Sequence, residues 1–244
     1  MSQSSAPTIV LVHGAFADAS SYAQVVPRLL ADGFTVVAPA VPNRSLIGDA
    51  AYIASVVRQI PGPVVLVGHS YGGAVITVAG VEDNVKALVY LAGYALAEGE
   101  SLGELQGRFP DSDLSQALVS TRFPLDPPDG PSGTGTDVSV DVARFPAILA
   151  GDVEPDLAAV LAVSQRPLAA QAFADPAPAA AWRTKPSWGL VCSADRTINP
   201  DVQRFGYQRA GTATTEVDSS HLVMLARPKE VVDLIRQAAR AVVR

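Results

Sequence analysis

The stretch GPVVLVGHSYGGAVITVAG, residues 62–80, carries the strongest structural signal in the chain. It opens with β-branched and apolar residues, breaks at a glycine-rich turn around Ser70, and ends as a small-residue segment of helical character. Gly68 and Gly72 flank Ser70 in the pattern G-x-S-x-G. Where a strand turns sharply into a helix, the central side chain is lifted clear of the sheet, and its neighbours two positions away must be very small. We therefore predict that Ser70 is a nucleophile on a strand–turn–helix elbow.

Other glycine-rich motifs do not fit this stretch. A Walker A loop requires Gly-Lys followed by Ser or Thr, and a dinucleotide-binding fingerprint requires G-x-G-x-x-G. Residues 68–73 read G-x-x-x-G-G and contain no lysine. The placement of the motif after a β-branched run and before a helical segment favours the elbow over a chance match.

Apolar runs and helical patterns alternate over most of the chain. Buried-strand patterns occur at residues 8–13, 35–40, 64–69, 87–92, 187–193 and 214–218, of which the last is the weakest. Helical patterns occur at residues 22–33, 46–60, 200–211 and 227–243. This alternation predicts an α/β fold with a doubly wound, mostly parallel sheet of about six strands.

The alternation fails between residues 96 and 184, which we predict to be a cap, or lid, inserted into a single domain spanning residues 1–244. This segment holds a Pro/Gly-rich loop at residues 124–137 and a helical stretch at residues 155–173. Residues 94–186 contain 13 acidic and 6 basic side chains, a balance of −7, whereas the remaining 11 acidic and 12 basic side chains give +1. The excess negative charge is either a solvated surface or a feature that disfavours anionic substrates.

Composition narrows the class of protein. The chain has 244 residues, of which 48% are hydrophobic and 17% are charged, and this suffices for a large core. Its net charge of −6 argues against nucleic-acid binding, and no apolar run reaches the roughly 18 residues that span a bilayer. A single cysteine excludes an intrachain disulfide, and the N-terminal MSQSSAPT lacks the basic and apolar regions of a signal peptide. We expect a cytoplasmic protein that acts on a small molecule, with neither nucleic acid nor membrane as a partner.

A serine nucleophile needs a base and a carboxylate that orients the base. Of the three histidines, His13 and His69 end strands before the serine, and His221 follows the last strand. Hydrolases with this elbow place the nucleophile, the acid and the base in that order along the chain, so His221 is the candidate base. Asp195, in the loop after the preceding strand, is the candidate acid. Asp218 competes for this role, but it would have to fold back on its own loop to reach the imidazole.

The reaction also needs two preorganised donors for the developing oxyanion. The backbone N–H of Tyr71, directly after the nucleophile, is one candidate. The N–H of Ala15, in the loop after the first strand, is the other, with Phe16 as a weaker alternative. Gly14, Phe16 and Leu222 are expected to line the substrate pocket around these groups.

Metal chemistry is not indicated. No cluster of His, Cys, Asp and Glu residues has metal-ligand spacing. Cys192 lies inside a predicted strand without an elbow, so we interpret it as a buried structural thiol. We expect neither a metal nor an organic cofactor.

Four segments carry a resemblance to a known family: LVHGAF (11–16), LVGHSYGG (66–73), SADRTINP (193–200) and SSHLVML (219–225). Together they resemble the α/β-hydrolase superfamily, and within it the small bacterial esterase-like hydrolases, which are similar to the plant methyl-esterase and hydroxynitrile-lyase branch. The resemblance covers essentially the whole chain outside the middle segment. It implies a catalytic triad of Ser70, Asp195 and His221, with the middle segment as the lid.

Departures from relatives of this fold narrow the reaction. Dehalogenases and epoxide hydrolases carry Asp at the elbow, where this chain has Ser70. Hydroxynitrile lyases carry Thr and Lys at the positions that Gly14 and Leu222 occupy here. We therefore predict a serine hydrolase that cleaves a small or medium neutral carboxylic ester or lactone through an acyl-enzyme. The alternatives are a ligand-sensing receptor with vestigial hydrolysis, and a cofactor-free haloperoxidase or lyase that uses the same pocket.

Overall fold

A six-stranded parallel sheet forms the centre of the computed structural model, which describes residues 6–125 and 133–243. The strand order is β2-β1-β3-β4-β8-β9, and every neighbouring pair is parallel. The strands are β1 (Thr8–Val12), β2 (Val36–Val37), β3 (Val64–His69), β4 (Val85–Leu91), β8 (Ser187–Cys192) and β9 (Ala213–Val217). The predicted fold class and all six predicted strands are confirmed, although β2 is only two residues long.

Burial explains why some strands were easier to predict than others. Every residue of β1 and β3 is buried, because helices cover both faces of the sheet, and these strands are therefore continuous apolar runs. Strand β9 lies at one edge of the sheet and is largely exposed, so its sequence ATTEV keeps polar residues and gives a weak signal.

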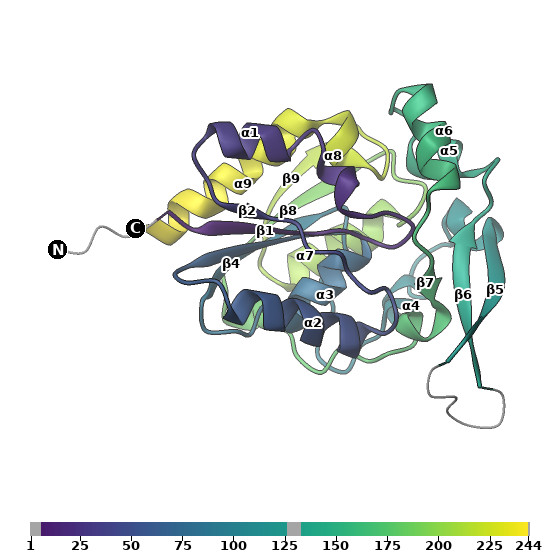
Figure 1. Ribbon diagram of the computed structural model, residues 1–244, viewed down its shortest axis with the longest axis horizontal. Helices are drawn as coiled ribbons and strands as arrows, with labels where there is room; N and C mark the ends of the chain where they lie inside the picture. The colour runs from purple at the N-terminus through teal and green to yellow at the C-terminus, as the bar shows by residue number, and fades with distance from the viewer. Residues whose placement is uncertain (1–5, 126–132, 244) are drawn as a thin grey trace.

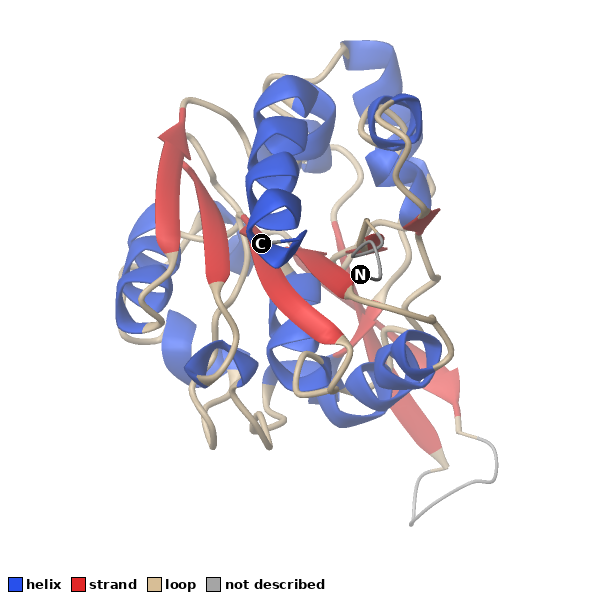
Figure 2. Ribbon diagram, turned by 90° about the vertical axis from the view of Figure 1, so that its left-hand side faces the viewer, coloured by secondary structure: helices blue, strands red, loops and turns tan. Residues whose placement is uncertain are grey.

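Two layers of helices enclose the sheet (Figure 1). Helices α1 (Val26–Ala31) and α9 (Pro228–Val243) lie on one face, and α2 (Leu46–Arg58) and α3 (Tyr71–Ala79) lie on the other. Figure 2 shows the strands between these helices from the side. Helix α7 (Pro200–Arg209) begins at a proline, as the sequence predicted. Proline is tolerated there because the N–H groups of the first helical turn have no acceptor within the helix.

The chain between β4 and β8, called the insertion here, adds a second layer beside the sheet. It holds an antiparallel sheet in the order β5-β6-β7. Its elements are α4 (Leu102–Gln106), β5 (Leu118–Pro124), β6 (Thr134–Val140), α5 (Phe145–Leu149), α6 (Pro155–Val163) and β7 (Leu168–Ala169). Figure 1 places β5, β6, α5 and α6 at the end of the molecule away from both chain termini.

The three-stranded sheet of the insertion was not predicted from the sequence. Residues 134–137, which we expected in a Pro/Gly-rich loop, belong to β6, while residues 126–132 of that expected loop lie outside the described residues. Six of the seven residues of β5 are exposed, so this strand has no apolar face to mark it. The predicted helical stretch at residues 155–173 contains α6, followed by β7 and a short 3₁₀ helix.

Hydrogen bonds join the first and the last residues of the insertion to each other. The backbone N–H of Gly99 donates to the carbonyl of Ala177, and the Ala177 N–H donates to the carbonyl of Glu100. The indole Nε1 of Trp182 donates to the carbonyl of Leu96 at 2.7 Å. These bonds join two stretches about eighty residues apart in the chain and fix where the insertion leaves and re-enters the fold.

Candidate active site

Ser70 lies at the turn between β3 and α3, in a backbone conformation that few residues adopt. Its φ of 55° and ψ of −123° are strained for a non-glycine residue. A Cβ atom on Gly68 would lie 2.4 Å from the carbonyl oxygen of Gly72, and one on Gly72 would lie 2.3 Å from the carbonyl oxygen of Val12. Gly68 therefore packs against the start of α3, and Gly72 packs against the end of β1, too closely for any side chain at either position. Small residues at these two positions are the requirement of the predicted elbow.

Asp195 and His221 meet in the interior at the carboxyl edge of the sheet. The imidazole Nδ1 of His221 donates to Oδ2 of Asp195 at 2.7 Å, and both residues are buried. The other carboxylate oxygen, Oδ1, accepts the backbone N–H groups of Thr197 and Ile198 at 2.7 and 3.0 Å. This arrangement fixes the tautomer of His221 and leaves Nε2 with a lone pair that can accept a proton.

Asp218, the competing carboxylate, does not take part in this arrangement. It is exposed, and its backbone carbonyl accepts a hydrogen bond from Arg227. Within the described part of the chain, its carboxylate has no hydrogen-bond partner.

His69 links the elbow to the loop that carries His221. The two imidazole centroids are 4.6 Å apart, and Nε2 of His69 donates to the backbone carbonyl of His221 at 2.9 Å. His221 therefore packs against the residue that directly precedes Ser70. No hydrogen bond joins the Ser70 hydroxyl to His221 among the described residues, and such bonds often form only when substrate is bound.

Burial keeps His13 and His69 neutral. Desolvation lowers the pKa of His13 below its ordinary value and that of His69 well below it. Nε2 of His13 accepts the backbone N–H of Val41 at 2.9 Å, and its Nδ1 donates to the carbonyl of Gly14 at 2.9 Å. Both histidines thus hold backbone segments at the carboxyl edge of the sheet.

Two backbone N–H groups beside Ser70 are free to bind an anion. Ala15 and Tyr71 line the same pocket as Ser70, and neither N–H donates to another residue in the described ranges. The N–H of Phe16 is instead bonded to the carbonyl of Arg166 at 3.0 Å. This difference favours Ala15 over Phe16 as the second oxyanion donor.

The pocket above Ser70 is small, partly enclosed and mostly apolar. Its cavity volume is about 10 Å³, which is room for about one water molecule. The elbow and the segments after β1 and β8 contribute Ala15, Phe16, Ser70, Tyr71, Thr197 and Ile198, and the insertion contributes Tyr94, Leu102, Leu114, Leu168 and Phe173. The insertion therefore covers the serine, and its side chains leave little free space beside it.

The predicted pocket residues differ in where they lie. Phe16 lines the pocket, whereas Gly14 and Leu222 are not among the residues that line it. Gly14 lies behind the nucleophile, where an added Cβ would be 2.7 Å from the Cβ of Ser70. Leu222 is buried and its N–H donates to the carbonyl of Leu149 in the insertion.

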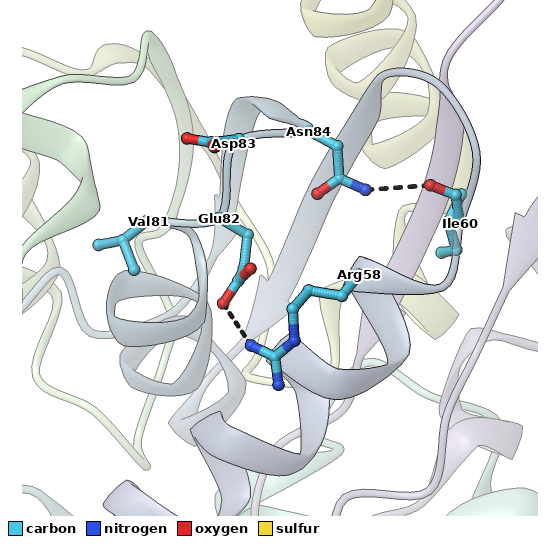
Figure 3. Close-up of a pocket in the computed structure, with 6 residues that line it drawn as sticks. All are labelled: Arg58, Ile60, Val81, Glu82, Asp83 and Asn84. Carbon is cyan, nitrogen blue, oxygen red and sulfur yellow. Dashed lines mark hydrogen bonds and ion pairs between the residues drawn. The ribbon is translucent and has the colours of Figure 1, made fainter.

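A larger hollow lies away from this chemistry, between the end of α2 and the start of β4 (Figure 3). Its cavity volume is about 470 Å³, and its lining holds an ion pair between Arg58 and Glu82 at 2.6 Å. Asn84 donates from Nδ2 to the carbonyl of Ile60 at 3.1 Å. The lining contains no serine, cysteine or histidine, and the hollow lies at the amino ends of β3 and β4, so we assign it no catalytic role.

Three further features bear on the predictions about metals, membranes and Cys192. In residues 6–125 and 133–243, no three His, Cys, Asp or Glu side chains are grouped so that they could hold a metal ion. No helix in those ranges is both long enough and apolar enough to cross a bilayer. Cys192 is buried in β8, and desolvation raises the pKa of its thiol well above the ordinary value.

Sequence reasoning missed three polar residues that support the site. Gln203 donates from Nε2 to Oδ2 of Asp195 at 2.8 Å, and the carboxylate of buried Asp49 accepts the hydroxyl of Tyr71 at 2.7 Å. Asp152 of the insertion contacts the loop before His221. The only sequence signal for Gln203 is its place in the helix that follows the acid loop, eight residues after Asp195. Nothing in the local sequence marks Asp49 or Asp152.

Comparisons with known proteins place the chain in a family. A model of the alpha/beta hydrolase family matches residues 9–234. The chain is 27% identical over 259 residues to alpha/beta hydrolase nvfD of Aspergillus novofumigatus, covering 96% of each protein. It is 36% identical over 126 residues to a carbendazim hydrolyzing esterase of Nocardioides sp., covering 45% of this chain and 51% of that one.

A solved structure shows the same fold at low sequence identity. Polyneuridine aldehyde esterase superposes on this chain with a TM-score of 0.81 at 18% identity, covering 96% of this chain and 99% of that one. The parallel six-stranded sheet and its flanking helices therefore form an alpha/beta hydrolase fold. Several of these relatives are named as hydrolases or esterases, in agreement with the prediction of an ester hydrolase.

Proposed function

Because the chain belongs to the alpha/beta hydrolase family, we propose that it is a serine hydrolase of small or medium-sized, neutral carboxylic esters or lactones. One observation carries the proposal. Ser70 lies on a strained elbow, and Nδ1 of the buried His221 is bonded to Oδ2 of Asp195 at 2.7 Å. The imidazole of His221 packs against His69, the residue directly before Ser70. A nucleophile, an orienting carboxylate and a base, in this order along the chain and at this edge of the sheet, are the parts of a catalytic triad.

The first half of the proposed reaction forms an acyl-enzyme. Nε2 of His221 takes the proton of the Ser70 hydroxyl while Oγ of Ser70 attacks the carbonyl carbon of the ester. The N–H groups of Ala15 and Tyr71 stabilise the negative charge that develops on the carbonyl oxygen. The C–O bond to the alcohol then breaks, and His221 gives the proton to the departing alcohol oxygen.

The second half releases the acid. His221 takes a proton from water, the hydroxide oxygen attacks the acyl carbon, and the bond to Ser70 breaks with return of the proton to its oxygen. The Asp195 carboxylate, held by two backbone N–H groups, stabilises the imidazolium that forms twice in each cycle.

The lining of the pocket supports an uncharged substrate. The hydroxyls of the two tyrosines in the lining are already bonded, Tyr71 to Asp49 and Tyr94 to Gln106. The remaining lining is apolar apart from Ser70 and Thr197. With no cationic side chain in this lining to receive an anion, an apolar acyl or alcohol group fits better than a charged one.

We further propose that residues 96–184 act as the cap of this single domain. Four apolar side chains of this segment close the pocket over Ser70. The excess negative charge of the segment acts in the same direction as the apolar lining, against anionic substrates.

The test is a panel of p-nitrophenyl esters, lactones and thioesters measured with the wild type and with Ser70→Ala. We expect turnover of neutral esters by the wild type and a loss of about 10⁶-fold in the variant, as removal of such a nucleophile causes. Circular dichroism of the variant controls for folding. A variant that keeps a tenth of the wild-type kcat would refute the assignment of Ser70. A folded wild type that turns over none of the panel would favour a ligand-binding role.

A further inference from the structure

A carboxylate of the insertion holds the loop that carries the proposed base. Asp152, just after α5, accepts the hydroxyl of Ser219 at 2.9 Å and the backbone N–H of Ser220 at 3.2 Å through Oδ2. Its Oδ1 accepts the hydroxyl of Ser220. Both serines are buried, and they directly precede His221. Three donors on two consecutive residues thus converge on one side chain that comes from outside the central sheet.

The carboxyl end of α5 contacts both loops of the proposed acid–base pair. On the histidine side, the N–H of Leu222 donates to the carbonyl of Leu149 at 3.0 Å. On the acid side, the Thr197 hydroxyl donates to the carbonyl of Ile148 at 3.2 Å. Arg196 adds a bond from its guanidinium to the carbonyl of Ala147 at 3.3 Å. The last carbonyls of a helix have no partner within the helix, and here they bind the two loops instead.

We propose that α5 and Asp152 form a clamp that positions Asp195 and His221 relative to each other. The expected effect of the clamp on catalysis rests on the proposed function. Asp152 is a positioning residue, because it touches neither the substrate nor the reacting atoms. The two loops follow different strands, β8 and β9, and the clamp joins them through a third segment of the chain. Movement of the insertion thereby changes the alignment of the base as well as access to the pocket.

The chemistry explains why a carboxylate occupies position 152. The two hydroxyls and the N–H of residues 219 and 220 are all donors, and an ionised carboxylate is acceptor-only with two oxygens. Arg227 lies 3.7 Å from Oδ2 and offsets the negative charge. The side chain of Asp152 is 25% exposed, so its ionised form keeps contact with water. Glu154, two residues on, is exposed and has no side-chain partner among the described residues, which makes it a matched control.

The experiment compares Asp152→Ala and Asp152→Asn with Glu154→Gln, which removes the same charge nearby. We expect kcat on an activated ester to fall about 10- to 100-fold in Asp152→Ala, with KM within about threefold, because a misplacement of about 1 Å has effects of this size. Asp152→Asn keeps one acceptor oxygen and should recover part of the loss. Glu154→Gln should match the wild type.

A second arm tests whether Asp152 acts through the two serines. The double variant Ser219→Ala/Ser220→Ala should lower kcat in the same way. Adding Asp152→Ala to it should cost little more, since residues that act together are not additive. Full additivity of the two effects would overturn the proposal. These milder variants, with Asp152→Asn, also test it if Asp152→Ala does not fold.

A spectroscopic readout separates this inference from the proposed function. The proton on Nδ1 of His221, bonded to Asp195, is expected to give a downfield ¹H NMR signal that does not depend on turnover. We expect that signal to shift or broaden in Asp152→Ala and to persist in Glu154→Gln. An unchanged signal and a kcat within twofold of the wild type, in folded Asp152→Ala, would overturn the clamp. If the wild type hydrolyses no ester, the signal alone still decides whether the clamp exists.

Discussion

Replacing Gly68 by alanine tests the geometry of the elbow without touching a reacting atom. The added Cβ would lie 2.4 Å from the carbonyl oxygen of Gly72, 2.6 Å from its carbonyl carbon and 2.8 Å from the nitrogen of Gly73. All three are backbone atoms in the first turn of α3, so no side chain can rotate away to make room. The start of the helix must shift, and with it Ser70 and the N–H of Tyr71.

The size of the effect follows from this overlap. Overpacking a well-packed site costs about 1–3 kcal/mol, and the loss of unfolded-state freedom on replacing glycine returns about 0.4–1 kcal/mol. In a chain of this length each kcal/mol changes Tm by roughly 2–4 °C. The central values leave a net cost of about 1.3 kcal/mol, so we expect Tm to fall by roughly 3–5 °C. We expect kcat on an activated ester to fall about 10²-fold, because the nucleophile and the adjacent backbone N–H move together.

The assay pairs calorimetry with steady-state kinetics on Gly68→Ala and on a control, Gly206→Ala. An added Cβ at Gly206, in α7, would have its nearest neighbour at 3.5 Å, which is ordinary contact. The control should keep the wild-type kcat and gain up to about 1 kcal/mol of stability from its helical position. A Gly68→Ala enzyme whose kcat stays within threefold of the wild type would refute the reasoning.

Three other predictions concern the acid Asp195, the buried His13 and the buried Cys192. Asp195→Asn should lower kcat by about 10³- to 10⁴-fold, while Asp218→Asn costs less than about tenfold; the reverse ranking would move the acid to Asp218. Burial holds the pKa of His13 below its ordinary value of 6.5, so the unfolded chain takes up the proton first. His13 therefore does not lower the free energy of unfolding above about pH 6.5. Below that pH, the free energy of unfolding falls by up to about 1.4 kcal/mol per pH unit because of His13. Urea unfolding between about pH 7.5 and 5.5 should show a flatter slope for His13→Gln than for the wild type, and equal slopes would contradict this. Burial also raises the pKa of Cys192, so iodoacetamide at about pH 8 should alkylate the urea-unfolded chain and not the folded one, as mass spectrometry would show.

The sequence was most informative where a residue has one physical reason to be there. Gly68 and Gly72 are required by backbone contacts shorter than 3 Å, and the continuous apolar runs of β1 and β3 reflect burial on both faces. The preference for Asp195 over Asp218 rested on the side from which a carboxylate must approach the imidazole. In the structure, Asp195 bonds to Nδ1 of His221 and to the backbone of its own loop.

The sequence was least informative where contacts join distant segments. Asp152 lies 67 residues before Ser219, and no periodicity connects them. The sheet of the insertion was missed because β5 is largely exposed and most residues of β6 are half-buried, so neither strand shows a clear alternation of apolar and polar residues. The pocket lining comes from four separate parts of the insertion, so the identity of the acyl and alcohol groups cannot be derived from local patterns.

The central claim is that Ser70 is the nucleophile, and a fluorophosphonate probe tests it most directly. Attack by the Ser70 oxygen on phosphorus expels fluoride and leaves a stable phosphonyl ester, since the oxyanion donors of Ala15 and Tyr71 hold the phosphoryl oxygen as they would an acyl oxygen. Intact-mass measurement should show one adduct in the wild type and none in Ser70→Ala, and peptide mapping should place it on Ser70. An enzyme that hydrolyses esters yet carries the adduct on another residue, or forms none, would contradict the assignment.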